Sequence, residues 1–297
     1  MQALVERLKA DLYARRLPQG GWPFSNESRQ MALEPTCLAL LALRPTDPWI
    51  SEALVDIQRS DGSWGSFAGD DDPSGLTGLA LLALSTLETA GNARSRAARW
   101  LLRSRGKEAD WPWRWKFRWR DTRVHFDPRK FGWPWHTGVC SWVVPTSFAL
   151  LALKRAFPHP TPGKAASRIR AGVEMLLDRV CPGGGWNAGN GLVYDTPMMP
   201  HIDVSAIALL ALQDDQPTDV AWCSLAWLER KAYDCEAPWS LAWSILALQA
   251  WKKDVDHLQS GLARLIESTP SQDTAILAAA LLAFKSTTSE NPSRLLS

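Results

Sequence analysis

The sequence predicts an all-α fold in which six inner and six outer helices alternate along the chain and close into a double ring, an α6/α6 toroid. Two observations lead to this prediction. One apolar phrase recurs along almost the whole chain, and a glycine-tryptophan turn precedes its first four copies. A chain with such self-similarity is built from stacked helical hairpins, each of which buries its apolar face against its neighbours.

The apolar phrase begins with a hydroxyl residue in its clearest copies and ends in Ala-Leu. The clear copies are 36–43, 77–84, 146–153 and 205–212, and two weaker ones are 241–248 and 277–284. These segments contain no charged residue over two helical turns, which is typical of a helix that is buried on every side. We therefore assign them to the inner ring.

The segments between these copies have one apolar stripe and one charged face, which predicts outer helices with one side in water. They cover about residues 1–15, 48–58, 92–104, 164–179, 218–231 and 253–267. A closed ring is favoured over an open solenoid, because inner helices this apolar need cover at both ends of the array. The wall of such a ring would surround a central hollow.

The turn from an outer to an inner helix has glycine followed by tryptophan, at 19–22, 61–65, 132–135 and 183–186. Glycine can end a helix in the left-handed conformation, and the indole that follows can cover the helix ends. We expect Trp22, Trp64, Trp133 and Trp186 to be structural for this reason.

The composition is that of a nearly neutral globular protein with an excess of tryptophan. Of 297 residues, 46% are hydrophobic and 17 are Trp, and the formal net charge is +2. This balance gives no general attraction to nucleic acid. The five cysteines form no CxxC pair, and residues 1–16 have the pattern of an amphipathic helix rather than a signal peptide. We therefore expect a cytoplasmic protein with reduced thiols. We also expect a single domain over 1–297, with an insertion at about 105–139, and no cofactor.

The glycine-tryptophan turn, followed by a hydroxyl residue and an Ala-Leu-rich helix, resembles the prenyltransferase and squalene oxidase repeat. This repeat occurs in squalene-hopene cyclases, terpene cyclases and protein prenyltransferase β-subunits. The similarity covers about residues 15–285, and the stretches 126–146 and 181–203 look like a subgroup of single-domain bacterial cyclase-like proteins. The resemblance implies the toroid fold, and as a function it implies binding or cyclisation of an isoprenoid-like ligand in a central cavity.

The resemblance also points to Asp203 as a catalytic acid. Class II terpene cyclases protonate their substrate with the middle aspartate of an Asp-x-Asp-Asp-Thr motif, and the matching stretch 201–205 reads His-Ile-Asp-Val-Ser. The resemblance thus implies that Asp203 donates the proton and that His201 tunes it. The interpretation that we favour is helix capping, because Asp203 precedes Ser205 by two residues just as Glu34 precedes Thr36.

Two other polar groups are candidate metal ligands. Asp70, Asp71 and Asp72 precede the second inner helix and are candidates for substrate binding, because they could hold a divalent cation beside a diphosphate. A solvated loop with a helix cap is the favoured interpretation. The zinc ligands of prenyltransferase β-subunits, Asp-x-Cys and a later histidine, are not reproduced, because Asp234 and Cys235 are adjacent. We expect no metal.

The segment 105–139 is the most unusual part of the chain. Trp113, Trp115, Phe117 and Trp119 alternate with arginine or lysine at 114, 116, 118 and 120. In an extended chain this period of two would place rings on one face and cations on the other. Such a strip would dock at a lipid interface, close over an apolar cavity, grip a phosphate, or form a surface hairpin that covers the toroid.

Tryptophans at the predicted starts of inner helices are candidates for lining the hollow. They are Trp135, Trp142, Trp239 and Trp243.

The sequence leaves three classes of function open. One is a terpene cyclase-like isomerase acting on a polyprenyl ligand, and another is a non-catalytic toroid that binds a lipid or a partner protein. The third is a carbohydrate-active enzyme, which would need two acids roughly 5–10 Å apart in an open cleft. The repeat phrase argues against the third class.

Overall fold

The computed structural model describes residues 1–45, 48–86, 90–119, 125–158, 163–268 and 271–286. Within these residues the inner helices are α2 (Leu33–Leu43), α4 (Thr77–Leu84), α7 (Val143–Ala156), α9 (Ile202–Leu212), α11 (Pro238–Ala250) and α13 (Thr274–Ser286). The outer helices are α1 (Gln2–Ala14), α3 (Pro48–Asp56), α5 (Gly91–Arg103), α8 (Gly163–Asp178), α10 (Asp219–Ala232) and α12 (Asp256–Ser268). Both predicted sets of helices are confirmed.

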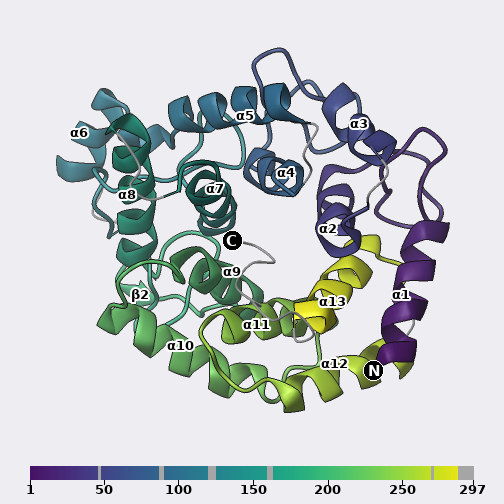
Figure 1. Ribbon diagram of the computed structural model, residues 1–297. Helices are drawn as coiled ribbons and strands as arrows, with labels where there is room; N and C mark the ends of the chain where they lie inside the picture. Colours follow the sequence, from purple (N-terminus) through teal and green to yellow (C-terminus); the bar gives the residue numbers. More distant parts are fainter. Residues whose placement is uncertain (46–47, 87–89, 120–124, 159–162, 269–270, 287–297) are drawn as a thin grey trace.

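The inner helices form a closed ring. Each one packs on the next in the order α2, α4, α7, α9, α11 and α13, and α13 packs on α2 (Figure 1). The outer helices surround this ring and pack on inner helices next to them in the chain, except α1, which packs on α13. The prediction of an all-α toroid, rather than an open superhelix, is confirmed.

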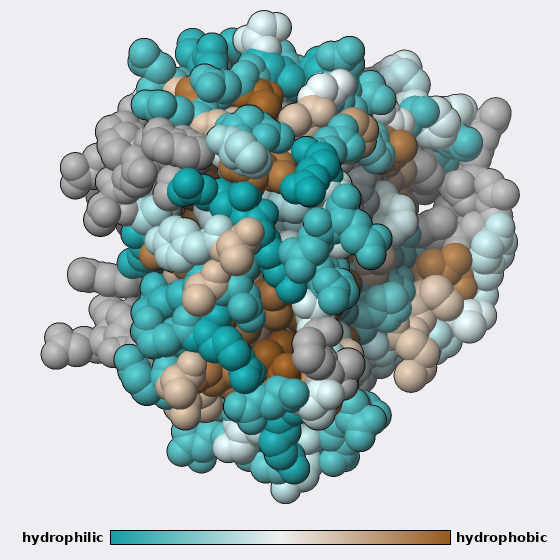
Figure 2. Space-filling model, turned by 90° about the vertical axis from the view of Figure 1, so that its right-hand side faces the viewer, coloured by the Kyte–Doolittle hydropathy of each residue, from teal (hydrophilic) through white to brown (hydrophobic). Residues whose placement is uncertain are grey.

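The two rings differ in burial as their sequences predict. Every residue of α4 is buried, whereas α5 and α12 bury only one stripe. Figure 2 views the side of the ring on which α1 lies, and this surface is mainly hydrophilic with separate hydrophobic patches. Burial of the apolar inner helices on all sides is therefore the main source of stability, since transfer of apolar surface out of water drives folding.

The tryptophan of each glycine-tryptophan turn ties the turn to the preceding outer helix. The indole Nε1 atoms donate hydrogen bonds of 2.6–2.9 Å to main-chain carbonyls near the ends of the outer helices. The pairs are Trp22 with Leu12, Trp64 with Leu54, Trp133 with Leu101, and Trp186 with Leu176. All four indoles are at most 1% exposed, so the expectation that they are structural is confirmed.

The hydroxyl residue at the start of the apolar phrase binds the same turn from the other side. The main-chain N–H of each turn tryptophan donates to a side-chain oxygen at 2.8–3.2 Å. The acceptors are Thr36, Thr77, Thr146 and Ser205. A buried N–H without a partner is unfavourable, and this bond is the physical reason that the phrase begins with a hydroxyl.

A third contact links each turn to the previous inner helix. The carbonyl two residues after the tryptophan accepts from an N–H at the start of that helix, as Ser66 does from Leu33. In the same way, the carbonyls of Trp135 and Ala188 accept from N–H groups at the starts of α4 and α7. Phe24 accepts from Thr274, at the start of the last helix, and this bond closes the ring. The inner helices therefore begin at one end of the ring, which we call the N-terminal mouth.

In the second and fourth turns glycine is required two residues before the tryptophan, because there the turn approaches the next outer helix closely. Gly62 and Gly184 have φ values of +97° and +98°. A Cβ atom at Gly62 would lie 2.6 Å from the carbonyl oxygen of Arg96, and one at Gly184 would lie 2.9 Å from that of Cys223. A larger residue would clash as well as strain the backbone.

The insertion between α5 and α7 contains a short 3-10 helix, η1 (Lys107–Ala109), and a helix, α6 (Trp111–Trp119). The expectation of an extended aromatic and basic strip is therefore wrong for 111–119. Pro112 fits the first turn of a helix, arginine and lysine favour the helix, and the segment has no β-branched residue to oppose it. The remaining cation of the strip, at 120, lies outside the described residues. A small hairpin of β1 (Leu192–Val193) and β2 (Thr196–Pro197) precedes α9.

Replacement of Trp64 by phenylalanine tests the role of the turn. The variant keeps most of the apolar surface but leaves the carbonyl of Leu54 without its indole donor, so the free energy of unfolding should fall by about 1–3 kcal/mol. Denaturant titration measures this loss. The matched control is Trp222→Phe on α10, where the side chain is 50% exposed and its replacement should have a much smaller effect. Equal losses in the two variants would contradict the assignment.

Candidate functional site

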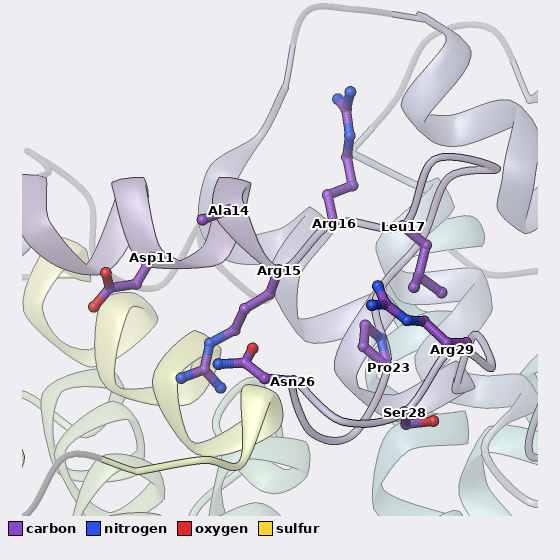
Figure 3. Close-up of a pocket in the computed structure, with 9 residues that line it drawn as sticks. All are labelled: Asp11, Ala14, Arg15, Arg16, Leu17, Pro23, Asn26, Ser28 and Arg29. Carbon is purple, nitrogen blue, oxygen red and sulfur yellow. The ribbon is translucent and has the colours of Figure 1, made fainter.

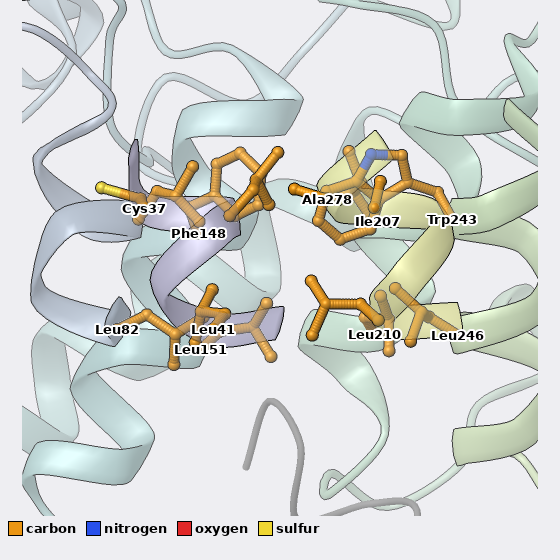
Figure 4. Packing of buried hydrophobic residues seen from close by; sticks show 14 of the residues in the cluster. Cys37, Leu41, Leu82, Phe148, Leu151, Ile207, Leu210, Trp243, Leu246 and Ala278 are labelled. Atoms are coloured by element: carbon orange, nitrogen blue, oxygen red, sulfur yellow. The ribbon is translucent and has the colours of Figure 1, made fainter. Parts of the chain in front are cut away.

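The register of the inner helices produces layers of side chains along the ring axis. A layer of leucines has one residue from each inner helix: Leu41, Leu82, Leu151, Leu210, Leu246 and Leu282. Figure 4 shows the first five facing one another across the ring. All six are at most 4% exposed. Because each lies five residues after the start of its phrase, the layer follows from the repeat itself.

A second apolar layer lies one turn closer to the N-terminal mouth. Phe148, Ile207 and Trp243 are large, whereas Cys37 and Ala278 are small, and all five lie inside the ring in Figure 4. The rings of Phe148 and Trp243 are 5.8 Å apart, and the five residues are at most 2% exposed. The side chains of these two layers are thus almost fully buried. The central hollow stays a prediction, and the partly exposed candidate residues lie nearer the mouth.

The mouth layer lies two helical turns before the leucines and therefore on the same inward face. Its members stand two residues before the start of each phrase: Glu34, Gly75, Val144, Asp203, Trp239 and Ala275. Glu34, Asp203 and Trp239 are partly exposed. The two acids belong to α2 and α9, which are three steps apart in the ring order and so lie on opposite sides of the mouth.

The structure brings Asp203, Trp239 and Trp243 together. Trp239 Nε1 donates to Asp203 Oδ2 at 3.3 Å, and the Trp239 ring meets the Trp243 ring edge-on at 5.6 Å. The buried Trp243 Nε1 has no hydrogen-bond partner among the described residues. The N-cap residues of α9 and α2 are His201 and Ala32, and neither helix has a side-chain capping bond. Asp203 and Glu34 stand in the first turns, so they suit the helix dipole without forming the expected cap. His201 is exposed at the N-cap of α9, where its backbone N–H donates to Trp186.

Glu34 is the mouth residue whose role the sequence did not reveal. Only part of its surface is exposed, and burial of the rest, followed by the negative charge of Asp273, raises its pKa to about 7. Asp273 is held at the start of α13, where its carboxylate accepts from the N–H of Ala275 at 2.7 Å. Glu34 is therefore a carboxylic acid that holds its proton close to neutral pH. The signal for Glu34 in the sequence is its register match with Asp203, since each acid precedes the hydroxyl of its phrase by two residues.

The other candidate tryptophans lie at the rim. The carbonyl of Trp135 accepts from the N–H of Gly75, and a Cβ atom on Gly75 would lie 3.0 Å from the Trp135 Cα. Trp142 is the N-cap residue of α7 and is 37% exposed. Neither belongs to the mouth layer, although Trp135 packs against the core.

The acidic run Asp70, Asp71 and Asp72 forms a loop. Asp70 accepts from the N–H groups of Ser66 and Asp72, and the Ser66 bond is the main cause of its lowered pKa. Asp71 lies 3.8 Å from Arg59. The start of α4 has no side-chain cap, so the cap expected from this run is not formed. Nowhere in the described residues do three or more His, Cys, Asp or Glu side chains form a group suited to a metal ion.

The residues considered for zinc lie in a separate pocket. Asp234, Cys235 and His257 are among the residues that line a pocket of about 860 Å³ between the α10–α11 turn and α12. His257 stacks on Tyr233 with a ring separation of 4.3 Å. All five cysteines are free thiols, and burial raises the pKa of Cys235. A raised pKa disfavours the thiolate that binds zinc.

A smaller pocket of about 320 Å³ lies between the C-terminal end of α1 and the loop that follows it, residues 15–29 (Figure 3). Arg15, which lines it, donates to the carbonyls of Ser271 and Gln272. Arg16, another lining residue, points away from it in Figure 3. We therefore assign Arg15 to ring closure rather than to ligand binding.

Cations and other polar residues form the opposite end of the axial stack. Eight residues after the start of each phrase stand Arg44, Ser85, Lys154, Gln213, Gln249 and Lys285. Lys154 and Lys285 donate to the carbonyls of Ala211 and Ala42, at the ends of neighbouring inner helices. Acids at the helix starts and cations at the helix ends both suit the helix dipole. The ring axis is thus polar at its two ends and apolar between them.

Comparisons with known proteins identify the fold but no family. Neither a protein-family model nor a curated protein matches the sequence. A protein from Actinoplanes has a similar structure, with a TM-score of 0.61, 15% identity, and coverage of 97% of this chain and 99% of that one. A novel alpha-amylase from Clostridium perfringens gives a TM-score of 0.64 with 13% identity and coverage of 95% and 97%. At such identities the likeness shows the fold alone.

A type II terpene cyclase from Scytonema, in complex with geranylgeranyl dihydroxybenzoate, is also similar. The identity is 14%, the coverage is 80% of this chain and 79% of that one, and the TM-score is 0.37. That value is too low to carry an argument about function. In the described part of the chain, no helix is both long and apolar enough to cross a membrane.

The raised pKa of Glu34 predicts a pH dependence of stability. Because the folded state holds this proton more tightly than the unfolded chain, the contribution is complete below about pH 4.5 and is lost as the pH rises to about 7. The loss is at most about 3 kcal/mol. Denaturant titrations at several pH values should therefore show a flatter profile for Glu34→Gln than for the wild type. The exposed Glu27→Gln is the control, and a profile for Glu34→Gln as steep as that of the wild type would contradict the prediction.

Proposed function

We propose that the N-terminal mouth binds a hydrophobic, isoprenoid-like molecule and that Glu34 gives a proton to it. The observation that carries the proposal is the mouth layer itself. It combines an acid that is protonated near neutral pH with the partly exposed indole of Trp239, which meets the buried Trp243 of the next layer edge-on. The remaining members of the layer, Gly75, Val144 and Ala275, add apolar or small surface.

This combination suits chemistry that begins with protonation of an alkene. The O–H bond of the acid breaks, a C–H bond forms at one alkene carbon, and a positive charge develops at the other carbon. Indole faces stabilise a cation by attraction to the ring quadrupole, with a magnitude of about 0.5–2 kcal/mol for each ring. A base must then remove a proton to give a neutral product, and the Asp203 carboxylate lies across the mouth from Glu34. Asp203 afterwards releases this proton to water and Glu34 takes one up from water, because both side chains are partly exposed. Such a reaction is an isomerisation or cyclisation with no net change in atoms.

In this proposal Asp203 has a different role from the one that the family resemblance implies, which is that of proton donor. Its carboxylate accepts the hydrogen bond of Trp239, so it orients that indole at the edge of the mouth. The proton donor is Glu34, on the opposite side of the ring. The two roles can be separated by conservative substitutions.

Glu34→Gln, Asp203→Asn and Trp239→Ala form the test set. After incubation with a series of linear polyprenols, product analysis should show loss of turnover in Glu34→Gln, while native mass spectrometry still detects the bound ligand. Trp239→Ala should lose ligand retention as well. Glu27→Gln serves as the control for a lost surface carboxylate. Undiminished turnover in Glu34→Gln would eliminate Glu34 as the donor, and absence of both binding and turnover in the wild type would eliminate the proposal.

One observation favours a second candidate, a glycoside hydrolase. The mouth presents two carboxyl groups on opposite inner helices, one with a raised pKa, and this division of roles is also the one used for general acid catalysis of glycosidic cleavage. The Clostridium perfringens structure with the similar fold is described as an alpha-amylase. Release of reducing sugar from soluble glucans by the wild type, lost in both Glu34→Gln and Asp203→Asn, would favour this candidate over the isoprenoid one.

A further inference from the structure

Helix α6 presents exposed indoles on the outside of the toroid. Trp111 is 80% exposed and Trp115 is 49% exposed. The two residues are four apart, so they lie one above the other on a single helix face. Figure 1 shows α6 outside the ring, beyond α8. Exposed indoles on one short helix form an apolar surface of the kind that marks an interaction site.

The charged side chains of α6 are all basic. Arg114 and Lys116 are exposed between and beside the two indoles, and α6 contains no acidic residue. Trp113 has the Lys107 and Lys116 amino groups at 4.1 and 4.6 Å from its ring centre. The helix therefore presents indoles and cations together. This combination complements a surface that has anionic groups on its outside and an apolar layer beneath them.

The base of α6 is firmly attached to the ring. Glu108 in η1 is fully buried, and both of its carboxylate oxygens accept from the N–H of Ser141 at 3.1 Å. Arg179, also buried, lies 3.5 Å from Glu108. The N–H of Lys107 donates to the carbonyl of Val139, a residue of the loop that enters α7. Because α7 starts at the N-terminal mouth, α6 projects from the rim of that mouth.

We propose that α6 docks the protein on an anionic lipid bilayer, with Trp111 and Trp115 at the level of the head groups and Arg114 and Lys116 against their phosphates. Indoles prefer the membrane interface, and basic side chains near an anionic leaflet add to the attraction. A nucleic acid would also attract aromatic and basic residues, but the formal net charge of +2 supplies no broad field to hold one. The contact is interfacial, and it is independent of the function proposed for the mouth.

Flotation with lipid vesicles tests the docking. The full-length protein should float with vesicles of phosphatidylcholine and phosphatidylserine, and much less with phosphatidylcholine alone. Raising the salt concentration should release it, because exposed charges are screened. The double variant Arg114→Gln/Lys116→Gln should bind about fivefold more weakly for each cation removed.

The indoles are tested separately with Trp111→Ala/Trp115→Ala, which should lose at least as much binding. The matched control is Trp222→Ala, which removes an indole as exposed as Trp115 from the outer helix α10. Full binding by the control and weak binding by both α6 variants would support the proposal. Failure of the wild type to float, equal losses in all three variants, or retention on single-stranded nucleic acid in preference to the vesicles would overturn it.

Discussion

The toroid depends on the tryptophan turn, because one short segment binds three helices at once. The indole of the tryptophan donates to a carbonyl of the preceding outer helix, and its backbone N–H donates to the hydroxyl of the following inner helix. A carbonyl two residues after the tryptophan accepts from an N–H at the start of the previous inner helix. Trp186 illustrates the first two contacts, with Leu176 and Ser205. Each contact satisfies a buried polar group that would otherwise destabilise the core. The bond from Thr274 to Phe24 extends this pattern across the ends of the chain and closes the ring.

A fixed turn geometry also fixes the height of each inner helix. Residues at the same offset from the turn therefore meet at the same level of the axis, and a repeat in sequence becomes a layer in space. The leucines represented by Leu41 and Leu210 form the most uniform layer, because every repeat has leucine at that offset. The mouth layer is the most varied, since it places Glu34 and Asp203 among apolar and aromatic residues. Its acids stand in the first turns of their helices, where the dipole favours negative charge.

The sequence was sufficient for the fold, because periodicity and the turn residues are local signals. It was sufficient for the position of Asp203 but not for the properties of Glu34. The pKa of Glu34 depends on Asp273, which is remote in sequence and becomes its neighbour only when α13 packs on α2. The alternation in the insertion was misleading for a related reason. A period of two favours an extended strand only where backbone propensity agrees, and residues 111–119 contain Pro112 in a first-turn position and good helix formers.

The varied mouth layer adjoins the place where the repeat is incomplete. The connections into α11 and α13 contain no glycine-tryptophan turn. At the start of α11 a tryptophan does appear, but it is Trp239, whose indole donates to the side chain of Asp203 rather than to an outer-helix carbonyl. At the start of α13 the polar residue is Asp273, which acts on Glu34. Four repeats with a complete turn thus provide a rigid frame, and the two without it contribute side chains that modify the mouth acids. Departures from local consistency in an otherwise regular chain are expected at functional sites, and here they converge on one end of the ring.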